Sequence, residues 1–285
     1  TQQSRGFQCM PRYEVMRNML PGENMGLCAC RQVILPNWNH CFAVDSIMES
    51  GYVSTQTREI NYLFPLYVYP NGEHLLESFP WPEGKDGRRP NLAPAFVEAF
   101  AGKLGLEFVA EGRGDLKRTF GPEDVFHYAY AVFHSPTYRS RYADFLKMDF
   151  PRLPLTGDRK LFARLCALGA ALAALHLLED APAPRATFPQ PGDNKVVKPR
   201  YTPPAGKTQG RVYINDVQYF DAVPPEVWDF RIGGYQVCEK WLKDRKGRIL
   251  DFADIERYRN ITEALRQTRD LMKKIDQTIP GWPII

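Results

Sequence analysis

The sequence predicts an α+β fold: a strand-rich N-terminal part, a central helical hairpin with a buried helix, and C-terminal strands followed by a long amphipathic helix. Three observations predict it. Residues 1–80 hold short β-forming runs broken by turns, residues 81–180 hold apolar residues at helical spacing, and residues 181–285 return to short alternating runs before one long helical segment. This order is not the regular alternation of parallel α/β units, so we expect one composite α+β domain.

The N-terminal part contains two predicted strand regions, "MGLCACRQVIL" and "LFPLYVYP". The runs "LPNWNHC", "ESG" and "PNGE" carry the Asn, Gly, Pro and Ser residues that favour turns. A linker dense in Pro and Gly, "FPWPEGKDGRRPNLAP", separates this part from the helices.

The helical part begins with a helix over 94–104 and continues with a hairpin of helices over 122–134 and 136–147. Pro122 suits the first position of its helix, and Ser135 can cap the second helix. A stripe of apolar residues predicts the buried face of the first helix: Val125, Phe126, Ala129, Val132 and Phe133. A second face of the same helix carries Tyr130 and two histidines, His127 and His134.

The two histidines of that face lie seven residues apart, which is too far for the usual chelation at i, i+4. We therefore interpret them as packed, hydrogen-bonded residues. On the second helix we expect Tyr138, Tyr142, Phe145 and Leu146 to face inward. Arg139 and Arg141 are expected to reach solvent, where they are available for phosphate.

The segment "LFARLCALGAALAALHLL" is long enough to imitate a membrane span, but it holds Arg164 and His176. A charge within a span costs a few kcal/mol, about 2.5–3.5 on insertion scales. We therefore expect a core helix over 159–180, with Asp158 as its N-cap, and no membrane partner.

The C-terminal part follows a second Pro/Gly-rich connection over 181–210. "RVYIND" and "VQYF" predict a hairpin with Asn215 and Asp216 at its turn. "VWDFRIGGYQVCEKWLKDR" predicts a strand and a short helix, and an amphipathic helix is expected over 251–277, beginning at Asp251.

Catalytic motifs are incomplete. Gly206-Lys207-Thr208 resembles the end of a phosphate-binding loop, but Tyr201 stands where the loop needs its first Gly, and two prolines remove backbone donors. Asp193 and Lys195 form the D-x-K half of a metal-dependent nuclease motif without an evident partner acid. We find no Gly-rich cofactor loop, no methyltransferase catalytic loop and no serine elbow.

Six cysteines in a chain without a secretory signal are expected to be reduced thiols in the cytoplasm. Cys28 and Cys30 are spaced C-x-C, which departs from the usual C-x₂₋₄-C zinc knuckle, so no metal is expected. The chain begins without Met, and we expect it to be the C-terminal fragment of a larger enzyme.

The formal net charge is only +4, but basic residues are concentrated in "KVVKPRYTPPAGKTQGR", which has no acidic residue. Lys and Arg bind phosphates, while Arg, Asn and Gln can form paired hydrogen bonds with base edges. A charge run is more often only a solvated surface, so this segment makes DNA a candidate partner but does not by itself decide for it.

Five segments together resemble the C-terminal specificity domain of type ISP restriction–modification enzymes and of related adenine-specific DNA methyltransferases. They are "QSRGFQCMPRYEVMRNML", "FPLYVYPNG", "DVFHYAYAVFHSPTYRSRYADFLKMDFPRLPL", "LFARLCALGAALAALHLLE" and "VPPEVWDFRIGGYQVCEKWLKDRKGR". The resemblance spans nearly the whole chain in the expected order.

The resemblance implies a non-catalytic target recognition domain that follows an N6-adenine methyltransferase domain in a prokaryotic, cytoplasmic polypeptide. It implies double-stranded DNA and that upstream methyltransferase domain as partners. No cofactor is expected in this chain; the parent protein would use S-adenosylmethionine, and full type ISP enzymes also use ATP and Mg²⁺.

We derive the DNA-contact candidates from side-chain chemistry, since the resemblance does not supply them. The candidate base readers are Arg31, Gln32, Gln56, Arg58, Asn61, Arg200 and Gln209. The candidate phosphate contacts are Arg139, Arg141, Lys195, Lys198, Lys207 and Lys243. Two alternatives stay open: a module that couples methyltransferase to motor without touching DNA, and a nuclease fragment using Asp193 and Lys195.

Overall fold

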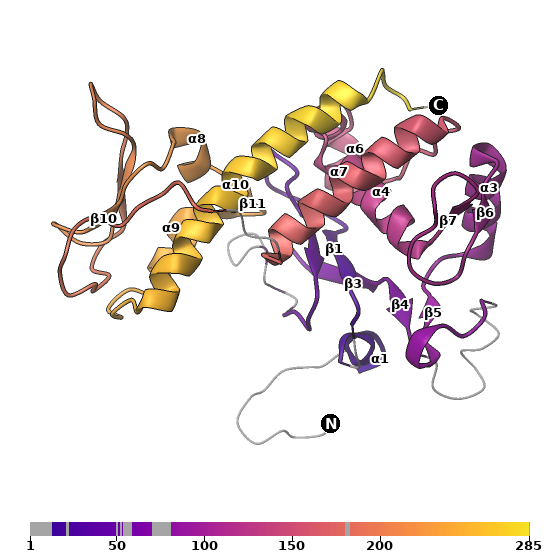
Figure 1. Ribbon diagram of the computed structural model, residues 1–285, viewed down its shortest axis with the longest axis horizontal. Helices are drawn as coiled ribbons and strands as arrows, with labels where there is room; N and C mark the ends of the chain where they lie inside the picture. Colours follow the sequence, from indigo (N-terminus) through magenta and orange to yellow (C-terminus); the bar gives the residue numbers. More distant parts are fainter. Residues whose placement is uncertain are drawn as a thin grey trace.

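The computed structural model describes residues 13–20, 23–49, 51, 53, 59–69, 81–179 and 183–284. It confirms the α+β class, with helices and several small sheets rather than one large sheet. The molecule is elongated: β10, α8 and α9 lie toward one end of the view and α3, β6 and β7 toward the other (Figure 1). Two separate hydrophobic cores correspond to an N-terminal lobe and a C-terminal lobe.

The N-terminal lobe contains a small antiparallel sheet with the strand order β2-β1-β3. Its elements are α1 (Tyr13–Met16), the 3₁₀ helix Arg17–Met19, β1 (Gly26–Cys30), β2 (Cys41–Val44), β3 (Asn61–Pro65), β4 (Tyr67–Val68), the 3₁₀ helix Lys85–Gly87 and β5 (Arg89–Pro90). In this sheet Ala29 of β1 lies between Cys41 and Tyr62 of the neighbouring strands. The strand regions predicted from "MGLCACRQVIL" and "LFPLYVYP" are therefore present as β1, β3 and β4.

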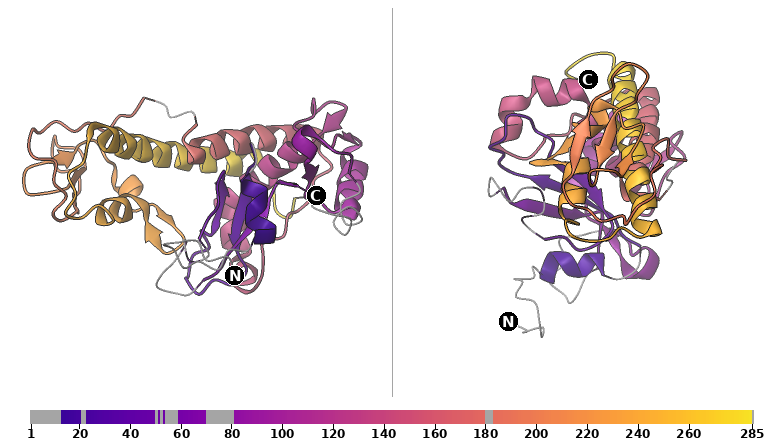
Figure 2. Two further views of the ribbon diagram at one scale, coloured as in Figure 1. Left: turned by 90° about the horizontal axis from the view of Figure 1, so that it is seen from below. Right: turned by 90° about the vertical axis from the view of Figure 1, so that its left-hand side faces the viewer.

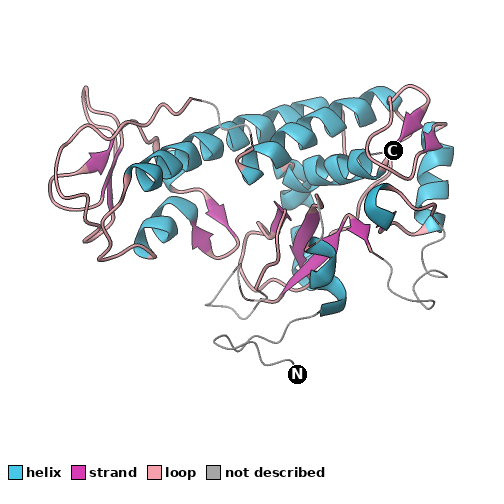
Figure 3. Cartoon of the chain, turned by 60° about the horizontal axis from the view of Figure 1, so that its bottom comes forward, coloured by secondary structure: helices cyan, strands magenta, loops and turns pink. Residues whose placement is uncertain are grey.

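Helices complete this lobe and cover the sheet (Figure 3). They and two short strands are α3 (Pro94–Leu104), β6 (Glu107–Phe108), β7 (Thr119–Phe120), α4 (Pro122–His134), α5 (Pro136–Arg141), α6 (Ala143–Met148) and α7 (Arg159–Leu177). Helices α4 and α7 both pack against β2. The expected helix over 136–147 is in fact two helices, because the backbone leaves helical geometry at Tyr142 (φ −106°, ψ 20°). Phe145, expected to face inward, is 68% exposed.

Helix α4 is buried on nearly every side rather than along one stripe. Its second face, with His127, Tyr130 and His134, is covered by α7, which packs closely against α4. Gly169 of α7 lies at the contact, where an added Cβ would fall 1.8 Å from the backbone oxygen of His127. The two helix backbones can approach this closely only because position 169 has no side chain.

The caps expected for these helices are present. The Asp158 side chain accepts hydrogen bonds from the backbone N–H groups of Lys160 (2.8 Å) and Leu161 (3.2 Å) at the start of α7. Ser135 Oγ accepts one from the N–H of Tyr138 (3.0 Å) at the start of α5. Each bond satisfies a donor that a helix N-terminus otherwise leaves unpaired.

Helix α7 is the one described helix with the length and composition of a membrane span. It packs against α4 on one side and α10 on another, with Phe162, Leu165 and Leu172 fully buried. It is therefore a core helix of the N-terminal lobe, as its sequence predicts.

The C-terminal lobe holds a three-stranded antiparallel sheet, order β10-β9-β8, and three helices. Its elements are β8 (Arg200–Thr202), β9 (Arg211–Tyr213), β10 (Tyr219–Phe220), α8 (Pro225–Trp228), β11 (Arg231–Ile232), β12 (Tyr235–Gln236), α9 (Val237–Lys243) and α10 (Phe252–Thr278). The predicted hairpin is β9–β10, whose turn is closed by Asn215: its Oδ1 accepts from the N–H groups of Val217 (3.0 Å) and Gln218 (2.7 Å).

Helix α10 connects the two lobes and runs beside α7 (Figure 2). It begins at Asp251, whose side chain accepts from the Asp254 N–H (2.7 Å), as predicted. Tyr258 and Leu265 belong to the C-terminal core, whereas Ile275 belongs to the N-terminal core. A second contact between the lobes is the β11–β12 turn, where Gly233 donates its N–H to the Asn39 oxygen (2.9 Å).

Candidate nucleic-acid interface

Along the strands of the β8–β10 sheet, residues that pack into the core alternate with arginine and tyrosine residues on the outer face. Successive residues of a strand point to opposite faces. Tyr201, Val212 and Phe220 form the row that packs into the C-terminal core. The adjacent cross-strand row lies on the opposite face and places Arg200, Tyr213 and Tyr219 side by side. In this row Arg200 is exposed, Tyr213 is half-buried and Tyr219 is buried.

Two arginines of this face lie over tyrosine rings. The guanidinium carbon of Arg200 is 3.9 Å from the centre of the Tyr213 ring, and that of Arg211 is 4.4 Å from the centre of the Tyr219 ring. The two tyrosine rings lie 5.0 Å apart. Such cation–π contacts orient a guanidinium and contribute about 0.5–1 kcal/mol each at exposed sites.

The two arginines differ in their acidic neighbours. Arg211 Nε lies 3.3 Å from Asp221 Oδ1, and both side chains are about a quarter exposed. Arg200 is exposed, and no carboxylate of the described residues lies within ion-pair distance of it. The positive charge of Arg200 is therefore available to an external anion or hydrogen-bond acceptor.

Further exposed basic residues lie in the segments of the chain next to this face. Lys195 and Lys198 precede β8, and Lys207 lies in the exposed loop between β8 and β9, in a turn closed by paired backbone hydrogen bonds between Ala205 and Thr208. The structure thus brings four sequence-predicted DNA contacts, namely Arg200 and these three lysines, into the C-terminal lobe. Gln209 is also exposed and follows Lys207 in the same loop. We call the outer face together with Lys195, Lys198 and Lys207 the basic sheet face.

The loop of the basic sheet face returns tightly into the core at Gly210. A Cβ at this position would lie 2.1 Å from the Val223 oxygen and 2.2 Å from the Tyr201 hydroxyl. The Tyr201 hydroxyl donates a hydrogen bond to the Val223 oxygen (2.9 Å). Because Gly210 has no side chain, it leaves room for this hydrogen bond at the base of the exposed loop.

Lys243 lies in the same lobe, on α9, and pairs with Glu239 at 2.9 Å while 58% of its side chain is exposed. Exposed pairs of this kind contribute little to stability. Lys243 can therefore exchange its partner for a phosphate at small cost.

A second group of predicted base readers lies at the sheet of the N-terminal lobe. Arg31 and Gln32 follow β1 and are exposed, and Arg31 pairs with Asp149 at 3.2 Å. Gln56 and Arg58 lie outside the described residues. The structure therefore places Arg31 and Gln32 on a surface, separate in sequence and core from the basic sheet face.

The buried Glu59 forms hydrogen bonds with the segment that follows β1. Its Oε1 accepts the Ile34 N–H (2.8 Å), and its Oε2 lies 3.0 Å from His40 Nε2. The Asn39 N–H donates to His40 Nδ1 (3.2 Å), so His40 is neutral and donates from Nε2. Burial lowers the pKa of His40, which agrees with this tautomer.

Two predicted contacts are corrected by their positions. Asn61 is not in a loop: it is the first residue of β3, 7% exposed, and its Oδ1 accepts from Cys30 Sγ (3.2 Å). Arg139 folds inward, donating from Nε to the Phe133 oxygen (2.7 Å) and from Nη1 to Asn39 Oδ1 (2.9 Å). Burial lowers the pKa of Arg139 to about 10. The Asn61 side chain is buried and that of Arg139 is bonded within the N-terminal lobe, whereas Arg141 is exposed as expected.

The histidines of α4 and α7 are packed within the N-terminal lobe. His134 Nδ1 bonds to the Tyr130 oxygen (2.8 Å), and His176 lies between the Tyr130 hydroxyl (2.6 Å) and Thr268 Oγ1 (2.9 Å). Burial lowers the pKa of His127 and of His176 to about 4. These neutral, buried rings have a structural role, although His127 Nδ1 has no partner within the described residues.

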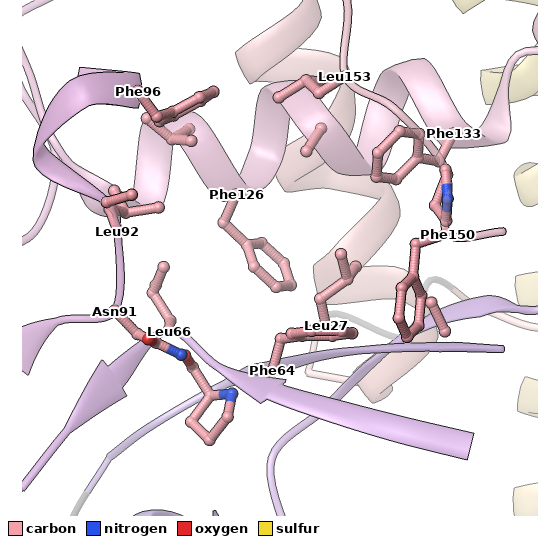
Figure 4. Close-up of a pocket in the computed structure, with 16 residues that line it drawn as sticks. Leu27, Phe64, Leu66, Asn91, Leu92, Phe96, Phe126, Phe133, Phe150 and Leu153 are labelled. Atoms are coloured by element: carbon pink, nitrogen blue, oxygen red, sulfur yellow. The ribbon is translucent and has the colours of Figure 1, made fainter. Parts of the chain in front are cut away.

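A cavity of about 450 Å³ lies between the N-terminal sheet and α4 (Figure 4). Leu27 and Phe64 line one side of it, and Phe126 and Phe133 the other. Asn91 is its one polar lining side chain, and the Asn91 amide already donates to the Pro65 oxygen (2.9 Å). The cavity offers apolar surface but no group for acid–base chemistry.

The nuclease half-motif serves a local turn in this structure. Asp193 Oδ1 accepts the backbone N–H of Lys195 (3.0 Å). Within the described ranges, no three His, Cys, Asp or Glu side chains gather as metal ligands. Cys30 and Cys41 are buried, and burial raises the pKa of each thiol to about 12, so both stay protonated.

A family model for the Type ISP C-terminal specificity domain matches residues 2–274 of this chain. The chain belongs to this family. No curated protein gives a significant match. Membership of this family indicates a role in target recognition for restriction–modification rather than in a catalytic step.

Three solved structures share the fold. They are a DrdV–DNA complex (21% identity, TM-score 0.64, 94% of this chain and 26% of that chain), a nuclease-deletion mutant of the Type ISP restriction–modification enzyme LlaGI with a DNA substrate mimic (17%, 0.59, 96% and 22%), and the ATP-dependent Type ISP enzyme LlaBIII bound to DNA (16%, 0.64, 97% and 17%). The specificity domain spans between 17% and 26% of these proteins.

Sequence reasoning missed the tyrosines of the basic sheet face. Tyr213 and Tyr219 support the two arginines, but neither was a candidate for DNA contact. The alternation of "RVY" in β9 was a usable signal, because it places Arg211 and Tyr213 on one face and Val212 on the other.

Proposed function

We propose that this specificity domain recognises the DNA target of a type ISP restriction–modification enzyme through its basic sheet face. The observation that carries the proposal is the exposed guanidinium of Arg200 over the half-buried ring of Tyr213, with the exposed Lys195, Lys198 and Lys207 in the adjoining segments of the chain. Cations of this kind bind backbone phosphates, whereas a fixed arginine can discriminate base edges. The three structural neighbours, all described as complexes with DNA or a DNA mimic, support DNA as the partner.

The chain would act beside an N6-adenine methyltransferase domain of the same polypeptide. That parent would use S-adenosylmethionine, with ATP and Mg²⁺ where a motor and a nuclease are present, and it would work in the cytoplasm. By holding the duplex at its target, the specificity domain would position an adenine that the methyltransferase extrudes from the helix for methylation.

The test is selection from a randomised duplex library at low and moderate salt, followed by sequencing of the bound fraction. An enriched motif that survives moderate salt is the expected result. Binding without enrichment, lost steeply with salt, would leave only phosphate contacts in this chain. A chain that binds no duplex but binds an upstream domain independently of salt would be a coupling module, contrary to the proposal.

The phosphate contacts can be counted from the salt dependence of affinity. Each contact contributes about 0.9 to the slope of log K against log salt. The double variant Lys198→Gln/Lys207→Gln should therefore lower the slope by about 1.8. Lys273→Gln/Lys274→Gln, an equal charge change at exposed positions near the end of α10, is the matched control and should leave the slope unchanged.

A further inference from the structure

Arg200 is held in an orientation that leaves its hydrogen-bonding edge free. Its guanidinium carbon lies 3.9 Å from the centre of the Tyr213 ring, so the ring occupies one face of the planar group. The N–H donors of a guanidinium lie in its plane and point away from its edges. Stacking therefore uses a face and spares the donors.

We propose that Arg200, positioned by Tyr213, reads a guanine in the major groove of the target. This inference rests on the proposed function and names the base that one residue of the basic sheet face recognises. Guanine presents O6 and N7 as adjacent acceptors in the major groove, and two parallel N–H groups of an arginine match them. The guanidinium edge of Arg200 supplies such a pair.

The position of Arg200 in the sheet favours a base over a phosphate. Arg200 begins the edge strand β8, and the exposed lysines Lys195, Lys198 and Lys207 lie in the segments that precede and follow this strand. Flexible lysines suit phosphates, which they contact as point charges from many directions. An arginine whose rotamer is already restricted loses less entropy on forming a directional pair, and direction is what base recognition requires.

Arg211 provides an internal comparison. It too lies over a tyrosine ring, at 4.4 Å from the centre of Tyr219, but its Nε pairs with Asp221 at 3.3 Å. With a carboxylate occupying part of its edge, Arg211 is less able to offer two free donors. The sheet thus holds two arginines over tyrosine rings, Arg200 without a carboxylate partner among the described residues and Arg211 paired with Asp221.

The experiment measures affinities of Arg200→Lys, Arg200→Ala and the control Arg164→Lys for a panel of duplexes. The panel contains the motif selected by the wild-type chain and every single base-pair replacement of it. Arg200→Lys keeps the charge and removes the paired donors. We expect it to lose discrimination at one G·C pair by about 5- to 150-fold, the range that 1–3 kcal/mol per bidentate pair implies, with affinity for unrelated duplexes within about twofold of the wild type.

The role of Tyr213 is tested by two further variants. Tyr213→Phe keeps a ring beneath Arg200 and should keep discrimination at that G·C pair, whereas Tyr213→Leu removes the ring and should weaken discrimination at the same pair. Circular dichroism of each variant checks the fold. Arg164→Lys, the same change at an exposed position of α7, is the control and should retain the wild-type preference at every position.

Three results would overturn the inference, and they are distinguishable. If Arg200→Ala weakens all duplexes equally and lowers the salt slope by about 0.9, Arg200 contacts a phosphate. If the preference is unchanged in both Arg200 variants, the guanine is read elsewhere or not at all. If the wild-type chain itself selects no motif, the proposed function fails first and the inference with it.

Discussion

The contact between α4 and α7 predicts opposite outcomes for two glycine-to-alanine substitutions. Gly169 lies in α7 and Gly102 in α3, both within helices. An added Cβ at Gly169 would lie 1.8 Å from the His127 oxygen, while one at Gly102 would meet nothing within 4 Å. The intrinsic change in helix propensity is the same at both sites, so their difference isolates the packing.

The magnitudes follow from two opposing effects. Alanine is favoured over glycine in a helix interior by about 1 kcal/mol. At Gly169 the Cβ needs about 3.3 Å from a backbone oxygen, so α4 and α7 would have to separate by about 1.5 Å. Overpacking a core costs about 1–3 kcal/mol and at times more, and the atom in the way belongs to a backbone that cannot rotate aside. We expect Gly169→Ala to lower the free energy of unfolding by about 2 kcal/mol or more, and Gly102→Ala to raise it by up to about 1 kcal/mol.

Urea unfolding followed by circular dichroism measures both changes under identical conditions. The m-value should stay constant if the substitutions alter stability rather than the unfolded state. A Gly169→Ala chain as stable as the wild type would show that α4 and α7 do not meet at this distance. A loss of stability in Gly102→Ala would show that propensity is not the dominant effect in α3.

Two further predictions concern buried charge. Burial depresses the pKa of His127 and of His176 from 6.5 to about 4, and that of His134 well below 6.5, so the folded state rejects protons that the unfolded chain accepts. Stability should be full above pH 6.5 and fall as the pH drops toward 4, by about 1.4 kcal/mol per pH unit for each histidine; urea unfolding at pH 7.5, 6 and 5 checks this, and a flat profile contradicts it. Arg139→Ala should lower the free energy of unfolding by roughly 2 kcal/mol or more, because it removes the hydrogen bonds of Arg139, and it should leave the salt slope of DNA binding unchanged. Arg141 is exposed, so Arg141→Ala should change the free energy of unfolding by less than about 0.5 kcal/mol.

Local signals predicted the parts of the fold that depend on neighbouring residues. Pro122 and Ser135 mark the starts of α4 and α5, and Asp158 and Asp251 cap α7 and α10 as expected. These signals act within one helical turn, so the sequence alone contains them. The break at Tyr142 is marked by no such local signal and was missed.

The candidate site shows the same division. The cluster of lysines around β8 was visible as a run of charge in one segment. Arg139 was misplaced because its partner Asn39 lies 100 residues away in the sequence. The stacking of Arg200 on Tyr213 depends on the register between β8 and β9, across a loop whose length does not determine the pairing. Chemistry that lies within a segment was predictable, while chemistry that depends on cross-strand register was not.

The β11–β12 turn is a clasp between the lobes, and Gly233 is its essential residue. Gly233 has φ +53°, donates its N–H to the Asn39 oxygen (2.9 Å), and would place a Cβ 2.6 Å from the Val53 oxygen. Gly247 has φ +82° but open space around it. Both alanine variants carry left-handed strain of about 1–2 kcal/mol, and Gly233→Ala alone adds the clash with the N-terminal lobe.

We therefore expect Gly233→Ala to destabilise the chain more than Gly247→Ala and to open the clasp selectively. Hydrogen exchange should show lost protection at residues 233 and 234, whose N–H groups are bonded to the Asn39 and Val53 oxygens, while the amides of α10 stay protected. Because Arg31 and Gln32 lie in one lobe and the basic sheet face in the other, a loosened clasp should also weaken binding to any duplex that contacts both. Equal stability and equal exchange in the two variants would mean that α10 alone sets the arrangement of the lobes.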